Sequence, residues 1–390
     1  MSIGTHDKSL IGFVQQFFIA PWGCFDYASR TMEPKTKKQM QEFREKIDSL
    51  DADILKLLTK RGAAAKAIGR IKEAEGLEVY VPSREKQIFK HIQAINKGPY
   101  GDASLFAIYR EIISATRSLE QPTRVAFLGP QATFTHQAAK QHFGFSTHYE
   151  AASDISEVFT AVEKGHADYG VVPVENSTEG VVNYTLDKFA DSELQICSEI
   201  ITPIEHNLLS KELTLKAIKT VYSHPQALAQ CRKWLALHLP HADCVETDST
   251  AQAAEIVSQK KNCAAVASLI AADLYALNRL KTAIQDEAKN FTRFLVIGQE
   301  QAQKTGNDKT SIAFVAKNKV GVLYDLLKAF AANKVNLSKI ESRPLKKRVW
   351  SYMFFVDMDG HLSESKIQKS MVQLAKHCES VKILGSYPKA

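Results

Sequence analysis

The sequence predicts a multidomain chain with three fold classes in succession: an all-α helical domain, a two-lobed α/β domain and an α+β domain of ferredoxin-like order. The first is predicted by apolar residues that recur every three or four positions, without a proline, from about residue 38 to 75. Short apolar runs that alternate with helical patterns predict the second. A single strand–helix–strand–strand–helix–strand succession predicts the third. We place the domains at residues 38–121, 122–300 and 301–390, after an N-terminal extension of unknown role at residues 1–37.

The composition is that of an ordinary globular protein, with 45% hydrophobic and 24% charged residues. The longest apolar runs are too short to span a membrane, and residues 1–37 lack a clean cleavage site, so we expect neither membrane attachment nor a signal peptide. The six cysteines lack metal-binding or disulfide spacing, which indicates a cytoplasmic protein. The net charge of +7 includes one tight basic cluster, Lys346–Arg348, which we interpret as a solvated loop rather than a nucleic-acid site.

The first helix carries two cations on its apolar stripe. Arg61 follows Leu58 by three residues and Lys72 follows Ile68 by four, so both cations point to the same side as the apolar residues. The helix is too long for its own segment to cover, which predicts a partner chain. Arg44 lies at a different angle, so only Arg44 of the partner subunit could reach the same pocket. This pattern predicts a buried anion pocket in a dimer; the alternative is that the two cations extend to solvent at the edge of the seam.

Two further helices are predicted at residues 84–96 and 102–119, after a glycine and a proline that end the first. Thr116 and Glu120 are four residues apart on the third helix, so they share a face.

These positions resemble the all-helical chorismate mutase family. The resemblance implies a dimer of three-helix chains in which arginines bind the carboxylates of chorismate. It also implies that Lys72 and Glu120 flank the ether oxygen and that Glu85 contacts the ring hydroxyl. The rearrangement is pericyclic, so it requires positioning and charge stabilisation rather than a nucleophile. The residues assigned to chorismate are Arg44 of the partner subunit, Arg61, Lys72, Arg84, Glu85, Thr116 and Glu120.

Two positions depart from this family. Val81 stands where many relatives have Asp, and Glu120 stands where many have Gln. A glutamic acid can donate to the ether oxygen only when it is protonated. We therefore expect mutase turnover to fall as pH rises, and Glu120→Gln to flatten that profile.

Polar loops follow several predicted strands of the α/β region, at residues 129–136, 175–180, 223–226 and 248–250. Ligands of open α/β sheets bind beyond the carboxyl ends of the strands, so these loops predict a cleft. For any single loop, turn formation or helix capping is the alternative explanation. The region has no GxGxxG, no phosphate loop and no His/Cys metal spacing, so we expect no nucleotide, no metal and no other cofactor.

Thr292 and Arg293 lie between two aromatic residues, Phe291 and Phe294. A hydroxyl can donate to a leaving oxygen, and a guanidinium can bind a carboxylate through two hydrogen bonds. In the alternative interpretation the aromatic residues are in the core, and Thr292 and Arg293 face solvent at the start of a strand.

Five stretches resemble the motifs of prephenate dehydratase, in the same order. They are residues 129–134, 173–180, 222–226, 249–251 and 290–294. The resemblance implies that the cleft converts prephenate into phenylpyruvate by loss of water and carbon dioxide, with Thr292 as the main donor to the leaving hydroxyl and Arg293 binding or ordering the substrate. The residues assigned to this site are Thr292, Arg293, Glu175, Asn176, Ser177, Gln226 and Thr133.

This chemistry needs no metal, because aromatisation drives it and the protein has only to assist hydroxide departure in a dry pocket. His136, His206 and His224 are alternative acids. We expect His136 to begin a helix and the other two to make structural hydrogen bonds.

The C-terminal domain has no catalytic constellation. Its stretches Lys319–Leu323 and Glu341–Pro344 resemble the effector motifs of the ACT domain attached to prephenate dehydratases. The resemblance implies that phenylalanine binds between paired ACT domains and inhibits the cleft. Val320 replaces the usual Pro, and Gly321 can let backbone amides approach a carboxylate, although a plain helix cap is the alternative. The residues assigned to the effector are Gly321, Val322, Leu323, Glu341, Ser342, Arg343 and Pro344.

Together the resemblances imply a cytoplasmic, bifunctional enzyme of phenylalanine synthesis that acts on chorismate and prephenate as a homodimer or a larger even-numbered assembly. Three alternatives stay open. The cleft could act on arogenate, which differs from prephenate by an amino group. The chain could sense amino acids without turnover. The helical domain could serve only as a dimerisation arm.

Overall fold

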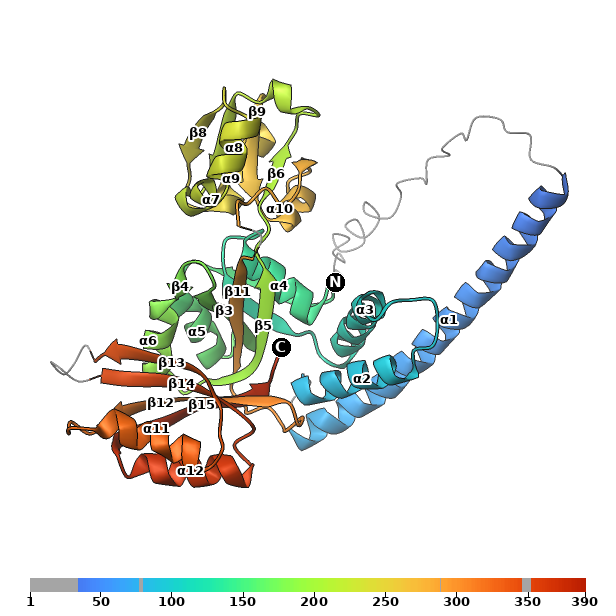
Figure 1. The fold of residues 1–390 in the computed structure, drawn as a ribbon. Coiled ribbons are helices and arrows are strands. Elements are labelled where there is room, and N and C mark those ends of the chain that lie inside the picture. Colours follow the sequence, from blue (N-terminus) through green and yellow to red (C-terminus); the bar gives the residue numbers. More distant parts are fainter. Residues whose placement is uncertain (1–33, 77–79, 288, 346–351) are drawn as a thin grey trace, which may run out of the picture. The chain divides into compact units, whose positions relative to one another are not determined.

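The structure is a computed structural model that describes residues 34–76, 80–287, 289–345 and 352–390 (Figure 1). The basic cluster Lys346–Arg348 and most of the predicted N-terminal extension lie outside the described residues. The chain forms two compact units, residues 1–60 and 61–390. None of the helices in the described part combines the length and the apolar character that a membrane span requires.

Helix α1 (Pro34–Glu75) begins in the first unit and confirms the long helix predicted from about residue 38. Its apolar stripe is solvent-exposed in the single chain: Phe43 is 67% exposed and Ile54 is 54% exposed. Apolar side chains at helical spacing normally pack against a partner. The exposed stripe of the first unit therefore fits a helix that is covered by another chain.

Two shorter helices follow in the second unit, α2 (Pro82–Ile95) and α3 (Asp102–Glu120). The C-terminal half of α1 approaches α3 closely at Gly69, where an added Cβ would lie 2.9 Å from the Cβ of Glu120. Only glycine allows this approach, and it brings the polar face of α3 against α1. Val81 is the N-cap residue of α2 and makes no side-chain capping bond.

The first lobe contains a twisted sheet in the order β2-β1-β3-β11-β5, with β4 paired to β3. Strand β1 runs parallel to β2 and β3, whereas β11 runs antiparallel to β3 and β5. Buried residues of β1, such as Val125 and Phe127, form the apolar run that predicted this strand. The strands are β1 (Arg124–Leu128), β2 (His148–Ala152), β3 (Tyr169–Asn176), β4 (Gly180–Val181), β5 (Gln195–Pro203) and β11 (Phe291–Gly298), and the helices are α4 (Phe134–Phe143), α5 (Ile155–Glu163) and α6 (Asn183–Asp191).

The second lobe is inserted between β5 and β11, so the chain crosses between the lobes twice. Its sheet has the order β10-β6-β9-β7-β8 around the fully buried strand β9. This confirms the two-lobed α/β prediction. The strands are β6 (Asn207–Ser210), β7 (Thr220–Ser223), β8 (Asp243–Glu246), β9 (Cys263–Ala267) and β10 (Asn278–Lys281), and the helices are η1 (Leu215–Ala217), α7 (Pro225–Gln230), α8 (Arg232–His238), α9 (Thr250–Gln259) and α10 (Leu269–Leu274).

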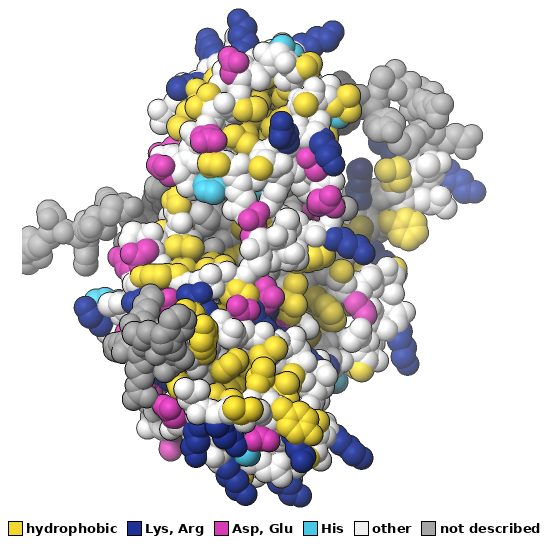
Figure 2. Space-filling view, turned by 60° about the vertical axis from the view of Figure 1, so that its left-hand side comes forward, with side chains coloured by type: hydrophobic (Ala, Val, Ile, Leu, Met, Phe, Trp, Pro, Cys, Tyr) yellow, Lys and Arg dark blue, Asp and Glu magenta, His cyan; other side chains and the backbone are white. Residues whose placement is uncertain are grey.

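The C-terminal domain confirms the predicted ferredoxin-like order. Its antiparallel sheet has the order β13-β14-β12-β15, and Figure 1 shows both of its helices on one side of the sheet. Apolar side chains also gather on the surface of this domain (Figure 2), and Val320 and Tyr324 are among the exposed ones. The elements are β12 (Asp308–Ala316), α11 (Val322–Ala332), β13 (Leu337–Pro344), β14 (Tyr352–Asp359), α12 (Ser365–Ala375) and β15 (Cys378–Pro388).

Candidate active sites

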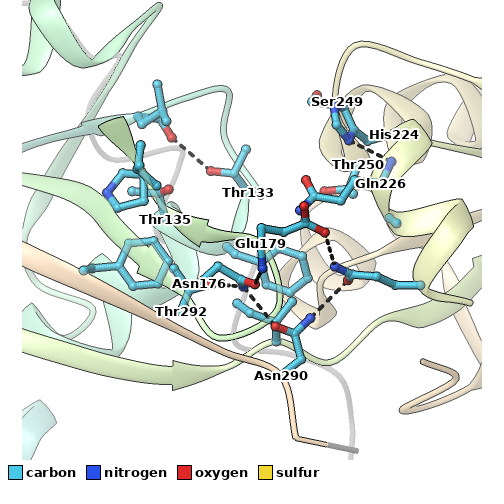
Figure 3. Close-up of a pocket in the computed structure, with 18 of the residues that line it drawn as sticks. Thr133, Thr135, Asn176, Glu179, His224, Gln226, Ser249, Thr250, Asn290 and Thr292 are labelled. Carbon is cyan, nitrogen blue, oxygen red and sulfur yellow. Dashed lines mark hydrogen bonds between the residues drawn. The ribbon is translucent and has the colours of Figure 1, made fainter. Parts of the chain in front are cut away.

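A cavity of about 510 Å³ lies between the two lobes. The close-up shows side chains from both lobes around it, with Thr292 and Asn176 on one side and Gln226 and Thr250 on the other (Figure 3). Polar lining residues of the first lobe and the hinge are Thr133, Thr135, Asn176, Glu179, Asn290 and Thr292, and those of the second lobe are His206, His224, Gln226, Gln230, Asp248, Ser249 and Thr250.

Thr292 lies directly opposite Asn176 on neighbouring strands, and it is only 8% exposed. The Asn176 amide Nδ2 donates to Thr292 Oγ1 at 2.8 Å and to Asn290 Oδ1 at 2.9 Å. Because Asn176 supplies the proton of the bond to Thr292, the hydroxyl proton of Thr292 remains available for a ligand in the cavity. The pair thus presents one oriented donor to the space between the lobes.

A chain of amides continues from this pair into the second lobe. Asn290 Nδ2 donates to Gln230 Oε1 at 3.0 Å, and Gln230 Nε2 donates to Glu179 Oε1 at 3.3 Å. His206 Nε2 lies 2.8 Å from the same Gln230 oxygen. Gln230 is at the end of α7, so these bonds connect the two lobes across the cavity.

The sequence reasoning did not assign Asn290, Glu179 or Gln230 to the site. Asn290 and Glu179 lie inside the motif stretches that were identified, so position within the motif could have pointed to them. Gln230 lies outside those stretches on a six-residue helix, and nothing in its sequence context indicates a site.

The N-termini of two helices, rather than cationic side chains, face this cavity. Thr133 is the N-cap of α4 and Ser249 is the N-cap of α9, and both residues line the cavity. Among the described residues that line the cavity there is no lysine and no arginine. The first N–H groups of a helix lack intrahelical partners and carry a partial positive charge. An anion in the cavity would therefore be bound by backbone amides and hydroxyls.

Thr133 and Gln226 both line the cavity, as expected, but the hydroxyl of Thr133 has other partners. Thr133 Oγ1 donates to the Leu128 carbonyl at 3.1 Å and accepts from the His136 amide at 3.3 Å. Its proton is therefore used to fix the start of α4. The helix-capping alternative describes this residue better than a role as a donor to substrate.

The structure corrects the expected position of Arg293, Glu175 and Ser177, because none of the three lines the cavity. Arg293 follows Thr292 and Glu175 precedes Asn176 in their strands, and alternate residues of a strand point to opposite faces. Arg293 and Glu175 therefore lie on the back of the sheet. Ser177 Oγ instead accepts from the backbone N–H of Phe291 at 2.9 Å, which ties the turn to the start of β11.

On the back of the sheet, Arg293 contacts the C-terminal domain. Its Nε lies 2.8 Å from Glu199, its Nη1 2.6 Å from Asp357, and its Nη2 donates to the Tyr387 hydroxyl at 2.9 Å. Lys309 also lies 2.8 Å from Glu199, and Lys339 lies 2.8 Å from Glu175. We call this set the ionic cluster, which contains three acidic and three basic residues: Glu175, Glu199, Asp357, Arg293, Lys309 and Lys339.

Two of the three histidines, His136 and His206, are buried and hydrogen-bonded. His136 lies in the first turn of α4, stacks on Phe127 at 4.5 Å, and accepts from the Ala132 amide through Nδ1 at 3.0 Å. Burial, with a smaller effect of Lys140, lowers the pKa of His136 to about 4. Burial also lowers the pKa of His206, which makes protonation of this cavity residue unfavourable.

The helical segment forms two polar links between α1 and α3. Arg61 donates to the hydroxyl of Thr116, and Lys72 Nζ lies 3.4 Å from Glu120 Oε2. The two cations of α1 thus meet the two polar residues that share a face of α3. Arg44 belongs to the unit of residues 1–60, where it is exposed.

Glu85 and Arg84 point in different directions from α2. Glu85 pairs at 2.7 Å with Arg117, a residue that the sequence reasoning did not single out. Arg117 is buried and also donates to the Phe143 carbonyl of the first lobe at 2.6 Å. Burial raises the pKa of Glu85, although Arg117 opposes this effect. Arg84 is exposed and contacts Gln87 at 3.3 Å.

The residues assigned to the effector lie in two parts of the C-terminal domain. Gly321 has a φ of 77° and caps α11, which Val322 and Leu323 begin. Glu341, Ser342, Arg343 and Pro344 end the edge strand β13. Arg343 is already engaged, because its Nη2 lies 3.1 Å from Asp187 in α6 of the first lobe.

The described residues form a cleft between two α/β lobes whose lining contains no lysine or arginine, a helical segment that carries cations, and a ferredoxin-like domain. These features define a class: a multidomain protein with separate candidate sites for small anions. Comparison with protein families places three matches in the same order along the chain. Residues 43–121 match chorismate mutase type II, residues 125–302 match prephenate dehydratase, and residues 310–376 match the ACT domain.

The chain is 50% identical over 357 residues to a bifunctional chorismate mutase/prephenate dehydratase of Aquifex aeolicus, which covers 90% of this chain and 99% of that protein. A protein of Stutzerimonas stutzeri with the same name is 44% identical over 358 residues, which is 90% of this chain and 98% of that protein. The solved prephenate dehydratase of Arthrobacter aurescens in complex with L-Phe is 35% identical, with a TM-score of 0.62, over 68% of this chain and 90% of that one. The chain belongs to the family of bifunctional chorismate mutase/prephenate dehydratases.

Proposed function

We propose that this chain catalyses two consecutive steps of phenylalanine synthesis. The helical segment rearranges chorismate to prephenate, and the cleft converts prephenate into phenylpyruvate. Phenylalanine binds the ACT domain and inhibits the cleft. The observation that carries the dehydratase assignment is the Asn176–Thr292 pair, which presents a hydroxyl proton to a cavity lined by neutral donors.

In the dehydratase step, Thr292 donates to the hydroxyl group that leaves the prephenate ring. The bond between the ring and its carboxylate breaks, its electron pair enters the ring, and the ring C–O bond breaks as the ring becomes aromatic. The departing hydroxide, still hydrogen-bonded to Thr292, takes up a proton from solvent and leaves as water, so each turnover consumes one proton. Asn176 assists because its N–H donates to Thr292 Oγ1, which makes the hydroxyl a better donor.

We propose that backbone amides at the starts of α4 and α9 bind the side-chain carboxylate of prephenate. The ring carboxylate then faces the apolar wall that includes Phe134 and Phe294, where lack of a cationic partner favours its loss as carbon dioxide. The cavity also contains two acidic residues, Glu179 and Asp248, which accept from Gln230 at 3.3 Å and from Gln252 at 3.2 Å. Arogenate is therefore the alternative substrate that the experiment below has to distinguish.

For the mutase step, we propose that Arg61, Arg84 and Arg44 of the partner subunit bind the two carboxylates of chorismate. Lys72, with Glu120, then stabilises the charge that develops on the ether oxygen. The exposed apolar stripe of α1 supports the homodimer that this arrangement requires. Glu85 and Thr116 complete the assignment, although their pairing with Arg117 and Arg61 must rearrange for direct substrate contact.

We further propose the domain boundaries 38–121, 122–300 and 301–390. The first could begin at Pro34, where α1 starts. A cytoplasmic location is supported by cysteines that lack disulfide or metal spacing.

The deciding experiment measures phenylpyruvate formation from prephenate by the intact chain and by Thr292→Val. We expect the variant to lose about a thousandfold or more in kcat, the effect of removing a donor that acts in the transition state. Thr202→Val is the matched control, because Thr202 is the cross-strand neighbour of Thr292 on β5 and is also buried. Equal turnover by Thr292→Val and the intact chain would refute the assignment. Turnover of arogenate but not of prephenate by the intact chain would replace the substrate.

A further inference from the structure

We propose that Lys339 is the residue through which the ACT domain acts on the dehydratase site, by means of its ion pair with Glu175. This inference rests on the proposed dehydratase function and names the contact that regulates it. Lys339 Nζ lies 2.8 Å from Glu175 Oε2, and the Lys339 side chain is 13% exposed. Glu175 immediately precedes Asn176, which orients Thr292.

Glu175 is connected to the Asn176–Thr292 pair by a single peptide bond within strand β3. Glu175 and Asn176 occupy adjacent positions in β3, opposite Arg293 and Thr292 in β11. A shift of Glu175 along or away from the sheet therefore moves Asn176 by a similar amount, because an extended strand has little freedom between neighbouring residues. A change of a few tenths of an ångström alters the bond that Asn176 donates to Thr292.

The other end of the connection is the strand that carries the residues assigned to the effector. Lys339 is two residues before Glu341 in β13, and Arg343 on the same face pairs with Asp187 of α6. Alternate residues of β13 are exposed, so Lys339, Glu341 and Arg343 face the dehydratase lobe while Ser342 faces away. Two ion pairs, one on either side of Glu341, thus attach this edge strand to the dehydratase lobe.

The remaining members of the ionic cluster are placed to anchor the two domains. Asp357 and Lys309 come from β14 and β12, the internal strands of the ACT sheet, and they hold Arg293 and Glu199. Strand β13 lies at the edge and pairs on one side only, so it can move with less disturbance of the sheet. Lys339 is the member of the ionic cluster that this edge strand contributes.

The chain offers a matched control for this contact. Lys382 also crosses from the ACT domain to the first lobe, where its Nζ donates to the Ser192 carbonyl at 2.6 Å and lies 3.3 Å from Glu193. It comes from β15, and the residues that its Nζ contacts, Ala190, Ser192 and Glu193, belong to neither β3 nor β11. Loss of Lys382 removes a lysine contact of similar kind without touching the path to Asn176.

The experiment measures dehydratase turnover against phenylalanine concentration in the intact chain, Lys339→Met, Lys339→Arg and Lys382→Met. We expect Lys339→Met to need at least tenfold more phenylalanine for half-inhibition while its uninhibited turnover stays within about threefold of the intact chain. Lys339→Arg retains the cation and should restore inhibition, and Lys382→Met should be inhibited normally. Calorimetry should show that Lys339→Met binds phenylalanine within about threefold of the intact chain, because the variant loses coupling rather than the effector site.

Coupling is reciprocal for binding, so phenylpyruvate should weaken phenylalanine binding in the intact chain but not in Lys339→Met. If Lys339 had only a structural role, phenylpyruvate would still weaken phenylalanine binding in Lys339→Met. Normal inhibition of Lys339→Met, or equal loss of inhibition in Lys382→Met, would overturn the proposal. An intact chain that forms phenylpyruvate but ignores phenylalanine would overturn it together with the proposed regulation. An intact chain without turnover would instead refute the proposed function, on which this proposal rests.

Discussion

The two faces of the β3–β11 pair differ in the kind of side chain they use. On the cavity face, Asn176 and Thr292 are neutral and are connected by one hydrogen bond of 2.8 Å. On the back, their neighbours Glu175 and Arg293 belong to an ionic cluster with three charges of each sign. Charge is thus placed where it fixes strands and joins domains, and the face that meets the substrate is left neutral. A fixed cation on the cavity face would stabilise the carboxylate that has to leave.

The largest expected effect is on stability and comes from removing Arg293 from the ionic cluster on the back of the sheet. Arg293→Met leaves Glu199 and Asp357 buried without their guanidinium partner, so we expect unfolding free energy to fall by about 3–5 kcal/mol. Urea unfolding measures this change. Arg279→Met is the control, because Arg279 and Asp273 form an exposed pair at 2.7 Å whose loss should cost below about 1 kcal/mol. Similar losses for the two variants would contradict the assignment of an anchoring role to the ionic cluster.

On the cavity face, the hydrogen bond from Asn176 to Thr292 can be removed by a substitution that hardly changes the size of the side chain. Asn176→Asp keeps the oxygen that accepts from the N–H groups of Thr178 and Glu179, but it replaces the donor to Thr292 by an acceptor. The Thr292 proton is then drawn to the carboxylate and away from the substrate. We expect kcat for prephenate to fall at least about a hundredfold, or about 3 kcal/mol.

Retention of the fold in Asn176→Asp is checked by its unfolding curve. Wild-type kcat in this variant would show that the orientation of Thr292 does not depend on an amide donor.

A buried histidine in the first turn of α4 has a signature in the pH dependence of stability. The pKa of His136 is lowered to about 4, so the folded chain holds a neutral imidazole where the unfolded chain takes up a proton below about pH 6.5. The stabilisation, up to about 3 kcal/mol, is therefore complete above pH 6.5 and is lost as pH falls towards 4.

Thermal unfolding between pH 7 and pH 4 measures this effect. His136→Asn keeps an acceptor for the Ala132 N–H but cannot titrate, so its stability should depend less on pH. The exposed His148 provides the control, since His148→Asn should leave the pH dependence of the intact chain unchanged. A His136→Asn profile parallel to that of the intact chain would exclude His136 as the titrating group.

The candidate site of the helical segment differs from the cleft in its charge. It contains cations such as Lys72, whereas the described residues that line the cleft include no lysine or arginine. Glu120 lies 3.4 Å from Lys72, and as a carboxylate it cannot donate to the ether oxygen of chorismate. We expect Glu120→Gln to raise mutase turnover severalfold above pH 7 and to flatten its pH profile. Mutase assays of the full chain from pH 5 to 9 test this, and an unchanged profile would remove Glu120 from the mechanism.

The order and type of the domains could be predicted because the periodicities of helices and strands are visible within short stretches of the sequence. The long helix, the alternation of the α/β region and the ferredoxin-like order are all confirmed. The short strands β2, β6 and β10 were not predicted. Stretches such as Asn207–Ser210 contain too few apolar residues in alternation to distinguish a strand from a loop.

The composition of the dehydratase site was partly predictable. Thr292 and Asn176 do meet, but Arg293 and Glu175 were expected beside them. The reason is that the adjacent residues Thr292 and Arg293 were assigned to one site, whereas β11 begins at Phe291 and contains both of them. Once Thr292 and Arg293 lie within a strand, alternation separates them onto opposite faces. Gln230 could not be predicted, because its contacts depend on how the two lobes come together.

The position of β11 has a consequence for how the nascent chain folds. All strands of the second lobe lie within residues 207–281, so this lobe can complete its sheet while the first lobe still lacks a central strand. Strands β3 and β5, both made earlier, border the gap that β11 fills last. Until residue 298 leaves the ribosome, both strands expose unpaired edges, the kind of surface that chaperones protect from aggregation. The threonine that we propose as the donor to substrate thus lies in the strand that completes the first lobe, and a chain truncated before β11 lacks both a complete sheet and the proposed dehydratase site.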